Sequence, residues 1–137
     1  MREISVRHEG GSRYTLVVRG HEVVVDQPVE DGGTDAGPTP AELFVASLAG
    51  CIAYFAGGFL ERHDIDAEGF GVEASYEYSD DAPHRVASID VRIALPPAFP
   101  ESRLTALQRV VEQCTVHNSL KQAPEVRIQV ATGTGPA

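Results

Sequence analysis

Hydrophobic and polar residues alternate through the first 25 positions of the chain, as they do in strands with one buried face. The apolar positions are Ile4 and Val6, then Tyr14, Leu16 and Val18, then Val23 and Val25. Gly10-Gly11 and Arg19-Gly20 interrupt the alternation twice. Turn residues between alternating runs are typical of hairpins, so the pattern predicts a three-stranded antiparallel meander.

Alternation returns in the second half of the chain. It runs through Phe70, Val72, Ala74, Tyr76 and Tyr78, and again through Ile89, Val91, Ile93 and Leu95, with residues 79–84 as a hairpin loop. Leu104, Leu107, Val111 and Cys114 recur at helical spacing and predict a second helix that includes Cys114. Val126, Ile128 and Val130 predict a last short strand.

Between these regions lies a long uncharged segment. The 18 residues from Leu43 to Leu60 carry no formal charge, which reaches the lower limit for a membrane span. The segment is rich in alanine, glycine and serine, so we expect a soluble helix and no membrane partner. Thr39-Pro40-Ala41-Glu42 predicts its start, with Thr39 as N-cap and Glu42 closing a capping box, and we expect it to end near residue 63.

A helix that is apolar all round must be covered on every side. A chain of 137 residues can hardly surround it alone, so we expect a second subunit to cover part of it. The predicted order is βββ-α-ββ-α-β, an α+β fold in a single domain over residues 1–137. The tail from about 132 to 137 is expected to be frayed.

Composition narrows the function classes. The net charge of −9 argues against a nucleic-acid partner, because such binding depends on basic patches. The five histidines form no ligand pair, and no glycine-rich loop joins a strand to a helix, so we expect neither a metal nor a cofactor. The first residues lack the apolar core of a signal peptide, which favours a cytoplasmic location.

The two cysteines are the most informative residues. Cys51 lies in the middle of the long helix, on one face with Phe44, Leu48 and Phe55, and Cys114 lies on the apolar face of the second helix. Both could be small buried hydrophobes. Alternatively they form a dithiol pair in which one sulfur is oxidised and the other resolves it. For Cys51, a lowered pKa would then require a nearby cation, such as an arginine.

Two segments carry a family resemblance. Residues 37–51, from Gly37-Pro38-Thr39-Pro40 to Cys51, resemble the helix-opening motif of the OsmC/Ohr family, in its OsmC-like branch. Cys114-Thr115-Val116-His117-Asn118-Ser119-Leu120 resembles its second cysteine motif, where proline is usual in place of Thr115. The resemblance extends over essentially the whole chain, including the order of its elements.

The resemblance implies an intertwined homodimer that reduces organic hydroperoxides or hydrogen peroxide. Cys51 would become a sulfenic acid, Cys114 would resolve it to a disulfide, and a thiol or lipoyl-type dithiol would reduce that disulfide. An arginine of the N-terminal meander activates the thiolate in the family, and Arg13 matches best, with Arg19 as runner-up. Either could equally be a solvated strand arginine.

Glu42 departs from the family pattern. The peroxidase branch has its glutamate ten residues before the cysteine, where Ala41 stands here, and Glu42 precedes Cys51 by nine residues. Nine residues are about two and a half helical turns, which directs the two side chains to opposite sides. Glu42 is therefore either a displaced catalytic carboxylate or simply a capping residue. His117 could carry protons or favour a helix end.

The shifted glutamate keeps two other functions open. The protein could be a non-catalytic member of the fold that holds a small apolar or acyl ligand in a cleft lined by Phe44, Leu48 and Phe55. It could also be a redox sensor that is oxidised once and is not recycled.

Overall fold

The computed structural model describes residues 1–133. The expected frayed tail falls mostly on residues 134–137, which lie outside the described part. The chain forms two compact units, one made of Met1–Leu43 with the C-terminal segment that starts at Glu125, the other of Phe44–Pro124. The single-domain expectation stays a prediction, and each unit is described by itself.

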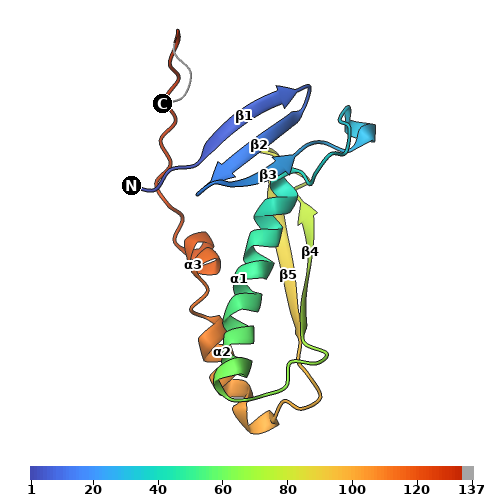
Figure 1. Ribbon diagram of the computed structural model, residues 1–137, viewed down its shortest axis with the longest axis vertical. Coiled ribbons are helices and arrows are strands. Elements are labelled where there is room, and N and C mark those ends of the chain that lie inside the picture. The colour runs from blue at the N-terminus through green and yellow to red at the C-terminus, as the bar shows by residue number, and fades with distance from the viewer. Residues whose placement is uncertain (134–137) are drawn as a thin grey trace. The chain divides into compact units, whose positions relative to one another are not determined.

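The N-terminal unit contains the predicted meander. Strands β1 (Ser5–Gly10), β2 (Arg13–Val18) and β3 (His21–Val25) pair antiparallel in the order β1-β2-β3 (Figure 1). Leu16 on the central strand pairs with Val6 on one side and Val23 on the other. Gly10 and Gly11 both have positive φ angles of 126° and 54°, which suits the turn between the first two strands.

A buried carboxylate organises the loop after β3. Asp26 is 1% exposed and accepts hydrogen bonds from the hydroxyls of Ser12 and Thr34, both at 2.5 Å, and from the backbone N–H of Ala36 at 3.1 Å. Gly37 is needed for packing, because a Cβ there would lie 2.2 Å from the carbonyl oxygen of Val24. The loop, which includes the short 3₁₀ helix Val29–Asp31, is thus a fixed structure.

Helix α1 (Pro40–Arg62) begins and ends within a residue of the predicted bounds. The Thr39 hydroxyl accepts from the backbone N–H of Glu42 at 3.1 Å, and the Glu42 carboxylate accepts from the N–H of Thr39 at 2.8 Å. These reciprocal bonds are a capping box, so the capping interpretation of Glu42 is confirmed.

In the second unit, α1 packs against the hairpin of β4 (Gly71–Tyr78) and β5 (Val86–Ala94), as the ribbon shows (Figure 1). One core cluster joins Leu48, Ile52 and Cys114 with residues of both strands. A second joins Ala56 and Phe59 with Leu107 of helix α2 (Leu104–Val111), which the 3₁₀ turn Glu101–Arg103 precedes. The hairpin prediction is confirmed.

The second predicted helix is wrong in its extent. Helix α2 ends at Val111, and Cys114 instead caps a third helix, α3 (Thr115–Lys121). Just before α3 the backbone hydrogen bonds span three residues instead of four. The N–H of Cys114, for example, donates to the carbonyl of Val111 at 3.1 Å. The apolar spacing continues across this break because both helices face the same core, which is why periodicity alone could not locate it.

The predicted last strand is also wrong. Val126, Ile128 and Val130 alternate as expected but are 74%, 86% and 91% exposed, and residues 123–131 have no strand assignment. A strand requires a neighbour for its backbone hydrogen bonds, and the described part of the chain supplies none to this segment. The observed order is therefore βββ-α-ββ-α-α.

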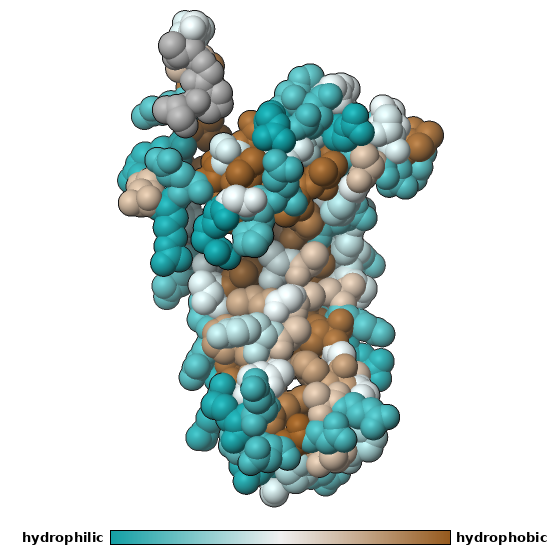
Figure 2. Space-filling model, in the orientation of Figure 1, coloured by the Kyte–Doolittle hydropathy of each residue, from teal (hydrophilic) through white to brown (hydrophobic). Residues whose placement is uncertain are grey.

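One face of α1 stays uncovered in the single chain. The buried positions form one stripe, through Val45, Leu48, Ile52, Ala56 and Phe59, whereas Tyr54 is 75% exposed. Figure 2, in the same orientation as Figure 1, shows pale to brown surface, which marks weakly polar to hydrophobic residues, over α1. By length and composition α1 could cross a membrane, which is weak evidence, since core helices of soluble proteins meet the same criterion.

Candidate functional site

The two cysteines meet in the helical unit. Cys114 is fully buried in the cluster with Leu48 and Ile52, and Cys51 is half-buried against the same cluster. Both are free thiols. Cys51 comes from the middle of α1 and Cys114 from the N-cap of α3, so the packing of α3 on α1 brings the sulfurs together.

The start of α3 surrounds the Cys51 sulfur with donors. Burial alone would raise the pKa of Cys51, but hydrogen bonds from the backbone N–H of Val116, the Cys114 thiol and the N–H of Thr115 lower this pKa below its ordinary value. The first N–H groups of a helix have no partner within the helix, which leaves them free to stabilise a thiolate.

Cys114 is affected in the opposite direction. Its sulfur accepts a hydrogen bond from the backbone N–H of His117 at 3.5 Å, as an N-cap side chain does. Burial nevertheless raises the pKa of Cys114, and donation to the Cys51 sulfur raises it further. The pair is thus polarised, with the pKa of Cys51 below its ordinary value and that of Cys114 above it.

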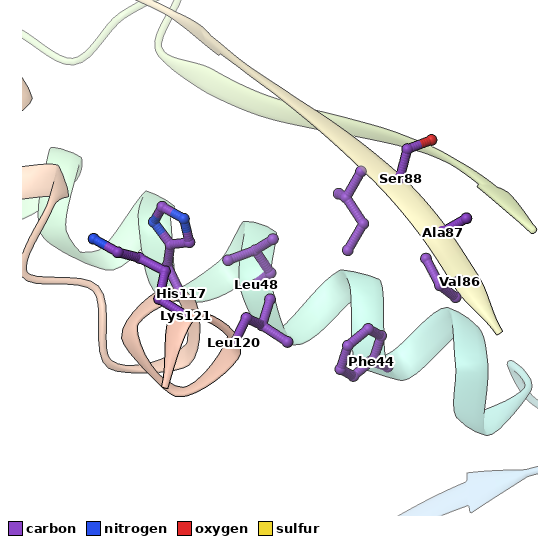
Figure 3. Close-up of a pocket in the computed structure, with 9 residues that line it drawn as sticks. Phe44, Leu48, Val86, Ala87, Ser88, His117, Leu120 and Lys121 are labelled. Carbon is purple, nitrogen blue, oxygen red and sulfur yellow. The ribbon is translucent and has the colours of Figure 1, made fainter. Parts of the chain in front are cut away.

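A hollow of about 330 Å³ opens beside the cysteine cluster. Three elements line it, with Phe44 and Leu48 from α1, Val86 to Ile89 from β5, and His117, Leu120 and Lys121 from α3. Figure 3 shows His117 and Lys121 together at one end and Phe44 at the other, with Leu48 and Leu120 between them. Neither cysteine lines the hollow, but Leu48 lies both in its wall and in the core cluster of Cys114, against which Cys51 packs.

Of the other expected site residues, Phe55 belongs to the helical unit, whereas Arg13, Arg19 and Glu42 belong to the N-terminal unit. Phe55 packs against the core cluster of Cys114 and does not line the hollow. Arg13 begins β2 in the N-terminal unit, where its charge acts on Glu9. Arg19 is exposed with a positive φ of 49° in the turn before β3. Glu42 is engaged by the N–H of Thr39 in the capping box.

The sequence did not indicate the donors that lower the pKa of Cys51, which are two backbone N–H groups and a thiol. The cation expected beside this mid-helix cysteine stays a prediction. The break between α2 and α3, once located, would have revealed these donors. Among the described residues, no cluster of three or more histidine, cysteine or acidic side chains could hold a metal ion.

Fold and site together define an α+β protein with a polarised pair of thiols at the junction of two helices. The family model described as OsmC-like protein matches residues 32–129, and the chain belongs to that family. No curated protein matches the sequence.

Solved structures share the fold. An osmotic stress induced and detoxification response protein from Psychrobacter arcticus 273-4 is 23% identical, with a TM-score of 0.75 over 87% of this chain and 88% of that one. An OsmC-like protein from Mycoplasma pneumoniae is 18% identical, with a TM-score of 0.71 over 90% and 89%. An organic hydroperoxide resistance protein OsmC from Legionella pneumophila is 16% identical, with a TM-score of 0.59 over 88% and 90%.

Proposed function

We propose that the protein is a cysteine-dependent reductase of organic hydroperoxides or hydrogen peroxide. The observation that carries the proposal is the polarised pair, in which Cys114 and the start of α3 donate hydrogen bonds to the Cys51 sulfur. Thiolates are the nucleophilic form of cysteine, and a peroxide is an electrophile at oxygen. The organic hydroperoxide resistance named for the Legionella pneumophila protein supports the same substrate class.

The chemistry divides between the two sulfurs. The Cys51 thiolate attacks the terminal oxygen of the hydroperoxide, the O–O bond breaks, and Cys51 becomes a sulfenic acid while the alcohol leaves. The Cys114 thiol then attacks the Cys51 sulfur, a disulfide forms, and water leaves. A thiol or lipoyl-type dithiol returns both cysteines to the reduced state by exchange. Phe44 and Leu48 offer an apolar wall to the organic part of the substrate.

Arg13, with Arg19 as the alternative, is the proposed charged partner of the thiolate. Arg13 is exposed at the start of β2, and its guanidinium carries no carboxylate bridge in the described part of the chain. Glu42, through its carboxylate, remains the weaker candidate for orienting that arginine, because the capping box already uses it.

We propose that the working form is a homodimer in the cytoplasm. The uncovered face of α1 with Tyr54 and the unpaired alternation of Val126, Ile128 and Val130 are apolar surfaces that a second copy would bury. Contiguous exposed apolar surface is typical of interaction sites. A reducing compartment would also keep both thiols free between turnovers.

The test is consumption of cumene hydroperoxide with dithiothreitol as reductant. Wild type should turn over and Cys51→Ser should be inactive. In the absence of dithiothreitol, Cys114→Ser should consume one equivalent of peroxide and stop at the sulfenic acid. Mass spectrometry of the oxidised wild type should show the Cys51–Cys114 disulfide. If wild type and Cys51→Ser consume peroxide equally slowly, the proposal fails.

The hollow beside the cysteines favours one other function, the binding of a small apolar or acyl ligand without chemistry. A ligand retained in native mass spectrometry together with absent peroxide turnover would support it. A sensor that is oxidised once is distinguished by its disulfide, which lipoyl protein would then fail to reduce.

A further inference from the structure

His117 contacts the cysteine pair through its backbone and the hollow through its side chain. Its backbone N–H donates to the Cys114 sulfur at 3.5 Å, and the residues just before it, Thr115 and Val116, donate to the Cys51 sulfur. Its side chain lines the hollow of about 330 Å³. In Figure 3 the imidazole stands at the end of the hollow that α3 forms, beside Lys121, and Phe44 lies toward the other end.

Cleavage of a hydroperoxide requires a proton for its leaving oxygen. When a thiolate attacks the terminal oxygen of R–O–OH, the O–O electron pair leaves on the RO oxygen. An alkoxide is a strong base, so the reaction is faster if an acid protonates that oxygen as the bond breaks. The apolar wall cannot supply this proton, and the Cys114 thiol does not line the hollow but donates to the Cys51 sulfur.

Two ionisable side chains line the hollow, His117 and Lys121. An imidazolium is a much stronger acid than an ammonium, so of these two side chains the histidine is the better proton donor. Lys121 is thus suited to attract an anion rather than to donate a proton. Glu42, the residue nearest to the family's glutamate in sequence, is engaged in the cap of α1.

We propose that His117 is the general acid of the reaction, donating its proton to the leaving alkoxide. This role rests on the proposed peroxidase function. The thiolate of Cys51 forms an S–O bond and is oxidised to the sulfenic acid, the O–O bond breaks, and the alkoxide takes the imidazolium proton to leave as the neutral alcohol. His117 is then neutral and is reprotonated from solvent through the open hollow.

The leaving group gives a direct test. Cumene hydroperoxide expels an alkoxide, whereas peroxyacetic acid expels acetate, which leaves without a proton because carboxylates are weak bases. Stopped-flow oxidation of reduced protein measures the single step, with Cys51→Ser as the background. For His117→Gln we expect a loss of about 100-fold with cumene hydroperoxide and less than about three-fold with peroxyacetic acid. Added imidazole should restore part of the lost rate in His117→Ala.

Two controls separate this role from a structural one. Replacement of the side chain keeps the N–H of His117, so the rate of Cys51 alkylation by iodoacetamide should match wild type. His84→Gln, an exposed histidine stacked on Tyr78 in the hairpin loop, should not discriminate between the peroxides. An equal loss with both peroxides, or no loss with either, overturns the role of His117. A wild type inert toward both overturns the peroxidase function itself.

Discussion

The thiol of Cys114 is hydrogen-bonded to the sulfur of Cys51, and the pKa values of the two cysteines move in opposite directions from their ordinary value. Burial raises both pKa values, and backbone N–H groups of α3 lower both, those of Val116 and Thr115 at Cys51 and those of His117 and Val116 at Cys114. The hydrogen bond between the sulfurs acts in opposite directions, because it lowers the pKa of Cys51 and raises that of Cys114. The start of α3 and the thiol of Cys114 together place the pKa of Cys51 below that of Cys114.

This assigns a measurable role to the residue at position 115. Proline is usual there in the family motif, and proline suits the first turn of a helix because its missing N–H costs no helical bond. In this chain Thr115→Pro would remove a donor from the Cys51 sulfur. We expect the helix to persist and the pKa of Cys51 to rise, measured as the pH at which alkylation by iodoacetamide reaches half its maximal rate.

The direction in which the pKa of Cys51 is shifted determines how its alkylation depends on pH. In wild type, Cys51 should be alkylated at lower pH than Cys114, because its thiolate forms first. Cys114→Ser retains a hydroxyl donor and an N-cap, whereas Cys114→Ala retains neither, so the alkylation midpoint of Cys51 should rise more in the alanine variant. A midpoint that is the same in Thr115→Pro, Cys114→Ala and wild type would contradict the polarisation by α3.

The buried carboxylate of Asp26 should make the N-terminal unit sensitive to acid. Hydrogen bonds from Ser12 and Thr34, and then from backbone N–H groups, hold the pKa of Asp26 well below its usual range despite its burial. A carboxylate with a lowered folded pKa stabilises the fold fully above its unfolded pKa of about 4, and this contribution declines as the pH falls further.

Asp26→Asn should therefore lower stability at pH 7 and flatten its decline below pH 4, measured by urea unfolding at a series of pH values. Asp31→Asn is the matched control, since it removes the same charge from an exposed position in the same loop. Surface changes of this kind alter stability by less than about 0.5 kcal/mol. Equal effects of the two substitutions would refute the role given to Asp26.

Substitution of Glu42 separates its two interpretations, a capping residue and a displaced catalytic carboxylate. Glu42→Gln keeps the capping box, because glutamine also accepts from the N-cap N–H, but it removes the charge that an arginine would require. We expect unchanged thermal stability and unchanged peroxide turnover. A marked loss of turnover with intact stability would instead assign Glu42 to the site. Thr39→Ala tests the cap itself and should cost about 1 kcal/mol of stability.

Much of the fold could be predicted from the sequence, because it depends on local signals. The meander follows from period-two alternation with glycine turns, and α1 follows from a capping box before a long uncharged segment. Helical spacing also directed Cys51 toward the core that Leu48 belongs to, and the packing of Cys51 against that cluster confirms this direction.

What could not be predicted depends on tertiary contacts. The apolar repeat from Leu104 to Cys114 is continuous, so only the backbone reveals that Cys114 begins a new helix and aims its first N–H groups at Cys51. In the sequence Asp26 is one of 20 acidic residues. Its burial depends on hydrogen bonds from Ser12, which precedes β3 in the chain, and from Thr34, which follows it. The alternation of residues 126–130 indicates a strand without naming its neighbour.

The last prediction concerns the neighbour with which the segment 126–130 could pair as a strand. Ile128 is 86% exposed, so in a monomer Ile128→Glu should change stability by less than about 0.5 kcal/mol. If a second copy pairs with this segment, the same change buries a charge in an apolar contact and should shift the protein from dimer to monomer at micromolar concentration in sedimentation velocity.

Gln129→Glu is the matched control, because residue 129 lies on the opposite side of an extended segment and receives the same charge. We expect it to remain dimeric, and Tyr54→Glu, on the uncovered face of α1, to weaken the dimer as Ile128→Glu does. A wild type that sediments as a monomer would refute the homodimer outright. A dimer indifferent to Ile128→Glu but broken by Tyr54→Glu would place the contact on α1 alone.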